Sequence, residues 1–386
     1  MRLRSQRSVL PVVFVAAVGA AVPLAAAAQS SGTTIKLGNS GATATLGGYI
    51  KLDAIYSIDQ DTGDTQDPTA LVIPDNQAGD KTFRFHARQT RLFLRTEKST
   101  PIGDLKTNLE GDFFGAGGNE VFSNSRTFRI RHAYGSIGGF GAGQTWTNFM
   151  QFTAYPSTVD FNGPMGTSFL RQAQVRYTVK SADGTEWSVS LENPEATGFA
   201  NPKDRFPDVT GRVKWQGDRW GLEASAVARF LEYETPTASD TTTGYGVMVS
   251  GRYRFADTTL MGNVVGGDGI GRYLYPAFGA ASGTGIGEAR IRADGSLDAI
   301  KAWGGQVAIM QQWTRIFSSV LSYGRTTGDA PEAISTRKLE SAHFANFWKP
   351  IPEVTFGAEL SWQRKTLQSS ASADAKRIQF SAQYNF

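Results

Sequence analysis

Apolar and polar residues alternate one by one along most of this chain, and the alternation continues to the last residue. It is clearest in residues 46–57, 105–113, 172–179, 209–215, 354–362 and 377–386. A period of two indicates a β-strand, because successive side chains of a strand point to opposite faces of the sheet. No convincing long amphipathic helix follows residue 28. The sequence therefore predicts an all-β protein.

The connections between the expected strands alternate in length. Seven are tight turns, at residues 98–103, 138–139, 181–184, 216–218, 256–257, 312–314 and 349–352. Eight are longer, polar loops, at residues 59–81, 116–125, 147–170, 193–205, 235–243, 266–298, 328–336 and 367–373. Seven turns and eight loops join sixteen strands, so both ends of the sheet region lie on the side of the short turns.

Short turns on one side and long loops on the other are typical of a barrel that crosses the bacterial outer membrane. Lipid cannot satisfy a free sheet edge, so the strands must pair in a closed ring, with apolar faces outward and polar faces inward. Aromatic residues fall near the strand ends that carry short turns, where interfacial rings belong. These residues are Phe140, Trp215, Trp220, Tyr253, Trp348, Tyr384 and Phe386. We expect a transmembrane antiparallel β-barrel of about 16 strands, with short periplasmic turns and long extracellular loops.

The N-terminus has the three parts of a secretory signal: three arginines, an apolar stretch and the small residues Ala26, Ala27 and Ala28. A permanent membrane anchor is the alternative, which Pro11 and Pro23 disfavour. We expect a signal peptide at 1–28 with cleavage near Ala28, a short segment at 29–44 and the barrel at 45–386. The whole chain has 39 basic and 35 acidic residues. Without the three signal arginines 36 basic residues remain, so global charge gives no reason to expect nucleic acid.

Motifs for catalysis or cofactor binding are not found. The chain has no Cys, which excludes disulfides, thiolate metal sites and Cys nucleophiles. His86, His132 and His343 have no metal-ligand spacing. Residues 59–67 hold several aspartates that suggest weak calcium binding, but the closing Glu of such a loop is missing, which favours a solvated acidic loop. We expect no enzyme activity, no cofactor and no metal.

The polar positions of the strands, which alternate with the apolar ones and are expected to face the lumen, include about thirteen bases and about five acids. A channel lined by one sign of charge concentrates counter-ions, and arginine grips carboxylates with two hydrogen bonds. We therefore expect an anion-attracting wall, with pairing between these arginines and wall acids as the alternative. In the second strand, Arg84 and Arg88 are out of phase with Arg91 and Arg95 in the alternation of apolar and polar residues. This change of phase indicates a bulge or an extension above the membrane. The residues expected to attract anions are Arg91, Arg95, Arg129, Arg131, Arg176, Arg212 and Arg252.

The loop at residues 147–170 has apolar rings and no Lys or Arg. Folding it into the barrel would remove these rings from water and narrow the bore. A loop that covers a subunit interface is the alternative. The residues expected at the constriction are Phe149, Phe152, Tyr155, Asp160, Phe161 and Asn162.

Several segments, in this order, resemble the DcaP-like trimeric outer-membrane porins. They are residues 88–96 (RQTRLFLRT), 131–135 (RHAYG), 143–149 (GQTWTNF), 347–352 (FWKPIP) and 379–386 (QFSAQYNF). The resemblance implies a homotrimer of sixteen-stranded barrels with an in-folded third loop, which takes up dicarboxylates or aromatic carboxylates. Some members carry an N-terminal coiled coil, for which residues 29–44 are too short and too rich in Gly, Ser and Thr.

Pattern and resemblance together predict passive diffusion of small anionic solutes through an outer-membrane porin. A structural or adhesive barrel with a closed pore, or a non-selective general porin, remains the alternative. The terminal Phe386 resembles the signal that the outer-membrane assembly machinery reads.

Overall fold

The computed structural model describes residues 32–73, 81–119, 121–150, 152–274 and 285–386. The expected signal peptide, residues 1–28, lies outside the described residues. The elements in chain order are β1 (Thr33–Lys36), β2 (Thr43–Ser57), η2 (Pro68–Ala70), β3 (Thr82–His86), β4 (Arg91–Thr100), β5 (Gly103–Asp112), β6 (Arg129–Ile137), β7 (Phe140–Trp146), β8 (Arg171–Lys180), β9 (Glu186–Glu192), β10 (Pro202–Lys203), β11 (Asp208–Gln216), β12 (Trp220–Glu234), β13 (Ser239–Phe255), β14 (Thr258–Asp268), β15 (Ala289–Ile291), β16 (Leu297–Ala299), β17 (Lys301–Gln312), β18 (Phe317–Gly328), β19 (Thr336–Ile351), β20 (Val354–Leu367) and β21 (Ser372–Asn385).

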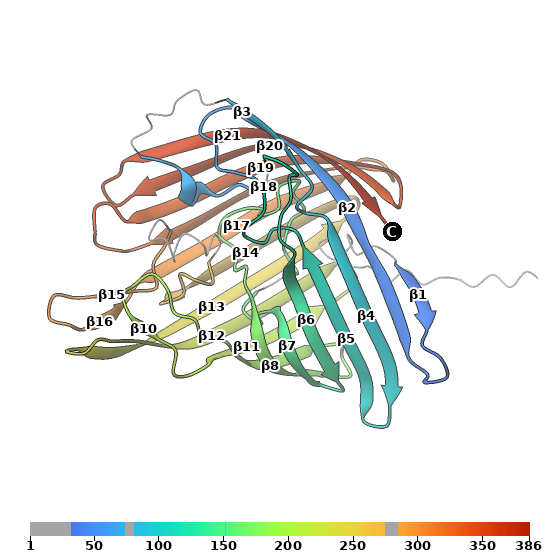
Figure 1. The fold of residues 1–386 in the computed structure, drawn as a ribbon, viewed down its shortest axis with the longest axis horizontal. Helices are drawn as coiled ribbons and strands as arrows, with labels where there is room; N and C mark the ends of the chain where they lie inside the picture. The colour runs from blue at the N-terminus through green and yellow to red at the C-terminus, as the bar shows by residue number, and fades with distance from the viewer. Residues whose placement is uncertain (1–31, 74–80, 120, 151, 275–284) are drawn as a thin grey trace, which may run out of the picture.

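Sixteen antiparallel strands of the described chain close into a barrel, when β3 and β4 are counted as one interrupted strand (Figure 1). Each wall strand pairs with the next along the chain, and the ring closes where β2 pairs with β21 from Tyr49↔Asn385 to Ser57↔Arg377. The predicted fold class is confirmed. No helix in the described ranges is long and apolar enough to cross a membrane.

Both ends of the described chain lie at the same end of the barrel, where β1 and the C-terminus are seen in Figure 1. β1 pairs with the first residues of β2, and Gly48 and Phe386 exchange backbone hydrogen bonds. The opposite end carries the small strands β10, β15 and β16. This arrangement agrees with the prediction that the ends lie on the side of the short turns.

The expected interruption between Arg88 and Arg91 is present. β3 ends at His86 and β4 begins at Arg91, and both pair with β2. A turn between them is closed by the hydrogen bond from Thr90 N to Ala87 O. The side chains of Arg84 and Arg88 therefore belong to a separate strand segment and its turn, and both contact Asp64 in the first loop.

The outer face of the barrel is apolar. On β12 and β13, for example, Leu222, Phe230, Val247 and Val249 are exposed, whereas the alternate residue Glu223 is buried. Exposed aromatic residues also occupy strand ends at the short turns, such as Trp220 opposite Tyr253. An exposed apolar surface of this extent is stable only in lipid, because soluble proteins expose much smaller apolar patches.

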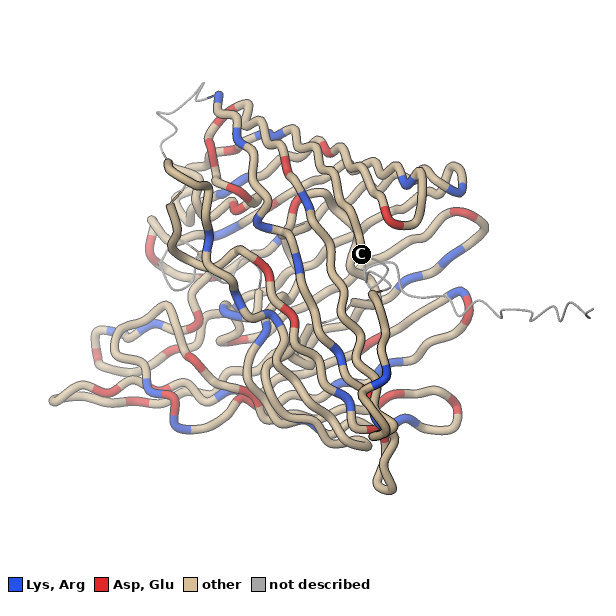
Figure 2. The backbone as a smooth tube through the Cα atoms, turned by 45° about the vertical axis from the view of Figure 1, so that its right-hand side comes forward, with Lys and Arg blue, Asp and Glu red and all other residues tan. Residues whose placement is uncertain are grey.

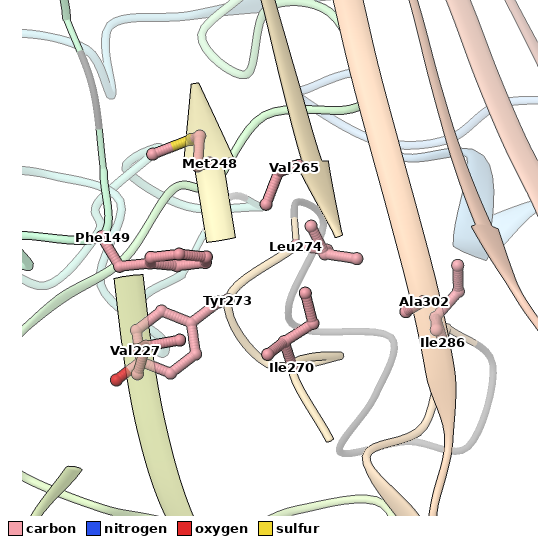
Figure 3. Packing of buried hydrophobic residues seen from close by; sticks show 9 residues of the cluster. All are labelled: Phe149, Val227, Met248, Val265, Ile270, Tyr273, Leu274, Ile286 and Ala302. Atoms are coloured by element: carbon pink, nitrogen blue, oxygen red, sulfur yellow. The ribbon is translucent and has the colours of Figure 1, made fainter. Parts of the chain in front are cut away.

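Part of the interior is filled by apolar side chains, which the alternation did not predict. Phe149 of the third loop (residues 147–170) packs against Tyr273 of the sixth loop (residues 269–300), with ring centroids 5.5 Å apart (Figure 3). Val227, Met248 and Val265 supply the wall side of this cluster, from β12, β13 and β14. The third loop and the described residues of the sixth loop thus narrow the bore beside these strands.

Candidate pore

The third loop lies inside the barrel and is held by the wall at several points. Its two ends meet where Thr147 N donates to Leu170 O. Between them, Thr153 Oγ1 donates to Glu223 on β12, and Gln306 Nε2 on β17 donates to Ala154 O. Such contacts with distant strands place the loop across the lumen, as the sequence predicted.

A cluster of buried polar side chains on β19 and β20 holds the far side of this loop. Val159 N donates to Glu359 Oε2 at 2.6 Å, and Met165 N donates to Ser341 Oγ at 3.0 Å. His343 lies between the two acceptors, 2.9 Å from Glu359 Oε1 and 3.2 Å from Ser341 Oγ. Ser341 and His343 are thus buried residues of β19 that help to hold the third loop.

Asp160 fixes the turn of the loop that carries Phe161. Its carboxylate accepts hydrogen bonds from Gln66 N at 2.8 Å and Asn162 N at 2.9 Å, and it lies 3.3 Å from Arg377 Nη1. Burial raises the pKa of Asp160, and the charge of Arg377 opposes this shift. Asn162 donates to Gln66 O, so the residues on both sides of Phe161 are held by the first loop.

Opposite Phe161, four arginines come together on β4 and β6. Arg91 and Arg95 lie on β4, and Arg129 and Arg131 lie on β6. In the register of β5 with β6, Glu110 pairs with His132 and Gly111 pairs with Ile130, so Arg131 is an extra residue. This β-bulge turns Arg131 and His132 to the same side, and both are buried.

Two carboxylates of β5 neutralise part of the positive charge of these four arginines. Asp112 binds Arg129 with two hydrogen bonds of 2.9 Å and accepts a third from Arg131 at 2.9 Å. Glu110 accepts from Arg131 Nε at 2.8 Å, and lies 3.5 Å from Arg91 Nε and 3.8 Å from Arg95 Nη2. Four guanidinium groups therefore share two carboxylates, which leaves a net positive charge on this side of the lumen.

A cavity of about 550 Å³ separates this basic wall from the third loop and from β17–β21. We name it the chamber. Arg91, Arg95 and Arg131 line it, and so do Phe152, Tyr155, Asp160 and Phe161 of the third loop. Phe161 packs 4.6 Å from the ring of Phe114, and its ring centre lies 5.6 Å from the guanidinium carbons of both Arg129 and Arg131.

The remaining predicted residues lie elsewhere. Arg176 on β8 donates to Trp146 O, Arg212 on β11 pairs with Glu186, and Arg252 on β13 lies beside Gly221; none of the three lines the chamber. Phe149 belongs to the apolar cluster, and Asn162 is buried against the first loop. Tyr155 donates its hydroxyl to Asn162 O, and burial raises the pKa of Tyr155.

The predicted excess of wall bases was overestimated. Two buried acids at strand ends, Glu192 and Asp208, were not counted as wall residues in the sequence pattern. Asp208 and Glu288 pair with the fully buried Arg229. Acidic and basic positions are interspersed along the strands, as Figure 2 shows. The alternative of pairing with wall acids therefore holds for most of the arginines.

Several chamber residues were missed from the sequence. Trp146, His132 and Lys349 line the chamber. Arg171 stacks 4.3 Å from the ring centre of Trp146, although strand parity groups it with the outward Ala173. His132 and Arg171 had no local signal, because a bulge and a strand end decide their orientation.

The acidic first loop is neutralised by arginine. Asp61 pairs with Arg84, and Asp64 pairs with Arg84 and Arg88. Among the described residues no group of three or more metal-ligating side chains is placed to hold an ion.

Comparison with known proteins gives the family. The family of the DcaP outer membrane protein matches residues 21–386. The chain belongs to this family. Another DcaP protein, the outer membrane channel DcaP of Acinetobacter baumannii, has the same fold in its crystal structure, with a TM-score of 0.79 and 23% identity over 91% of this chain and 99% of that one.

Two further comparisons are with more distant proteins. An anion-selective porin from Comamonas acidovorans shares the fold of this DcaP chain, with a TM-score of 0.59 and 14% identity over 89% of this chain and 100% of that one. Porin Omp2a of Brucella suis and Brucella canis is 25% identical over 234 residues, which is 55% of this chain. The match spans 59% of the length of these curated relatives. The DcaP-family chain is an outer membrane protein.

Proposed function

We propose that this protein is a porin for the passive diffusion of small anionic solutes across the outer membrane. The observation that carries the proposal is the chamber, where Arg91, Arg95 and Arg131 face the aromatic side of the third loop. A surplus of guanidinium groups in a narrow space of low dielectric raises the local anion concentration. The names of two comparison proteins, an outer membrane channel and an anion-selective porin, support the same direction.

Carboxylates are the solute class that fits best. Arginine presents a planar fork that suits a carboxylate, and Trp146, Phe152 and Phe161 offer flat apolar surface in the same chamber. Dicarboxylates and aromatic carboxylates satisfy both features. Diffusion down a gradient requires neither a cofactor nor bond chemistry.

The remaining expectations belong to the same proposal. Residues 1–28 act as a signal peptide that is cleaved near Ala28, and Phe386 serves the outer-membrane assembly machinery.

A homotrimer is expected to pack through the part of the barrel wall that is formed by short strands, since β7 and β9 have seven residues each and β12 has 15. The exposed apolar residues Val189 and Leu191 on β9 suit such contacts. Mobility on unheated gels before and after dissociation tests the trimer.

The test of the function is the reversal potential across a planar bilayer in a KCl gradient. We expect an anion-selective current, and a lower selectivity when Arg129→Gln and Arg131→Gln are combined. The matched control combines Arg290→Gln with Arg292→Gln, which removes the same charge from the exposed β15–β16 hairpin. A cation-selective current contradicts the proposal.

A closed barrel with a structural or adhesive role is the second candidate. The apolar cluster around Phe149 and Tyr273, which fills part of the lumen, favours it. Absence of any single-channel current in the folded protein supports this candidate, and an open channel without ion preference supports a general porin.

A further inference from the structure

Glu110 occupies the position in the chamber where an anion is expected to bind. Three arginines and one histidine approach its carboxylate within 4.0 Å: Arg131 at 2.8 Å, Arg91 at 3.5 Å, Arg95 at 3.8 Å and His132 at 4.0 Å. The carboxylate of Glu110 therefore occupies an anion-binding position as part of the barrel wall itself.

The contacts around this carboxylate are unequal. Arg131 forms a hydrogen bond with Glu110, and both side chains are nearly closed to solvent, at 5% and 8% exposure. Arg91 and Arg95 contact the same carboxylate at longer range and keep 21% and 29% of their side chains exposed. Nε of Arg91 is buried and lacks a hydrogen-bond partner among the described residues.

Stacking keeps these two partly exposed arginines in place. The guanidinium of Arg91 lies 5.2 Å from the ring centre of Tyr49, and that of Arg95 lies 4.1 Å from the ring centre of Phe93. Arg95 also donates to Asn108 Oδ1 at 3.3 Å. Their position thus depends on neighbours other than Glu110, so their orientation is expected to survive the loss of its charge.

We propose that Glu110 is a built-in counter-ion that competes with passing anions for Arg91 and Arg95, and so shortens the time for which an anion is held in the chamber. This inference rests on the proposed anion transport. A pore needs binding that is favourable enough for entry and weak enough for exit. Without Glu110, two stacked arginines beside Arg131 form a deeper well in which an organic anion stays longer.

A purely structural role predicts the opposite sign. If Glu110 only held the arginines in position, its neutralisation would disorder them and weaken anion binding. If it competes with the solute, neutralisation strengthens anion binding. The direction of the change therefore separates the two roles.

The experiment records single-channel currents of the full-length protein in planar bilayers, with sodium benzoate as the probe. Glu110→Gln is expected to lower the half-blocking benzoate concentration about tenfold and to lengthen each block, because it removes a like charge near the bound carboxylate. Glu110→Asp withdraws the carboxylate by one methylene. It is expected to change the half-blocking concentration and the block duration in the same direction as Glu110→Gln, but by a smaller amount. This variant decides the question if the glutamine variant does not fold.

The matched control is Glu340→Gln on β19, which removes the same charge from a residue paired with Lys338 outside the chamber. It is expected to leave the benzoate block as in the wild type. If the wild type passes no anion current, the proposed function fails. If the wild type passes anions but the Glu110 variants bind benzoate equally or more weakly, only the counter-ion role is overturned.

Discussion

The guanidinium carbon of Arg171 lies 4.3 Å from the ring centre of Trp146, its cross-strand partner at the base of the third loop. Nη1 of Arg171 has no hydrogen-bond partner, and the side chain forms no ion pair, among the described residues. Trp146 lines the chamber. Stacking thus holds a cation beside the chamber, and no carboxylate of the described residues forms an ion pair with it.

We expect Arg171→Gln to lower the ratio of anion to cation permeability, because an uncompensated charge contributes more field than a paired one. Reversal potentials in a KCl gradient measure this ratio. Arg292→Gln, in the exposed β15–β16 hairpin, is the control for the change in total charge. Equal effects of the two substitutions would refute a local role for Arg171.

We propose that Phe161 sets the width of the passage between the third loop and β6. Its ring lies 4.6 Å from Phe114 and 5.6 Å from the guanidinium carbons of Arg129 and Arg131. We expect Phe161→Ala to raise single-channel conductance and to reduce anion preference, since a wider bore places ions farther from the arginines. Phe122→Ala removes an exposed ring from the second loop and is the control. Unchanged conductance in Phe161→Ala would place the constriction elsewhere.

The architecture was predictable because an outer-membrane barrel repeats one local rule. Alternation identifies strands such as β12 and β21, and tight turns fix the order of neighbours without long-range information. The rule also placed Arg91 and Arg95 on the inward face of β4, and the apolar rings of the third loop correctly indicated that the loop folds inward.

The details of the site were less predictable because they depend on partner strands. Alternation assumes an unbroken phase, and the bulge in β6 turns both Arg131 and His132 inward. Phe149 and Phe161 belong to the same apolar loop, but only Phe161 lines the chamber, because Tyr273 from the distant sixth loop covers Phe149. Contacts of this kind arise only when the barrel has closed.

Asp160 is expected to control the rigidity of the third loop. Its carboxylate accepts from the backbone N–H groups of Gln66 and Asn162. Asp160→Ala leaves both buried donors without an acceptor, at about 1–3 kcal/mol each. We expect a lower thermal unfolding midpoint, noisier single-channel currents and faster protease cleavage within residues 147–170.

Two substitutions accompany this experiment. Asp160→Asn keeps an oxygen acceptor and is expected to produce smaller changes. Asp294→Ala removes an exposed aspartate that accepts from Ser296 in the hairpin turn, and is expected to leave the third loop unchanged. A quiet, heat-stable Asp160→Ala channel would show that the other wall contacts suffice.

Gly166 allows the third loop to touch the wall of the barrel. Its φ is +80°, and an added Cβ would lie 2.1 Å from Gly305 O and 2.5 Å from Arg325 O. Gly166 N donates to Thr326 Oγ1 at 2.9 Å, and Asn263 Nδ2 donates to Gly166 O at 2.8 Å. Gly166→Ala therefore cannot keep both hydrogen bonds without moving the loop away from β17 and β18.

Gly184→Ala is the control that separates the steric contact of an added Cβ at Gly166 from the cost of placing alanine in the left-handed backbone conformation. The φ of Gly184 is +83°, and an added Cβ would meet nothing within 4 Å. Gly184→Ala should cost about 1–2 kcal/mol through the left-handed conformation alone and leave conductance unchanged. Gly166→Ala should destabilise the barrel more and also change conductance, because the displaced loop lies across the lumen. If the two variants unfold at the same temperature and conduct alike, the close approach of Gly166 to the wall does not position the third loop.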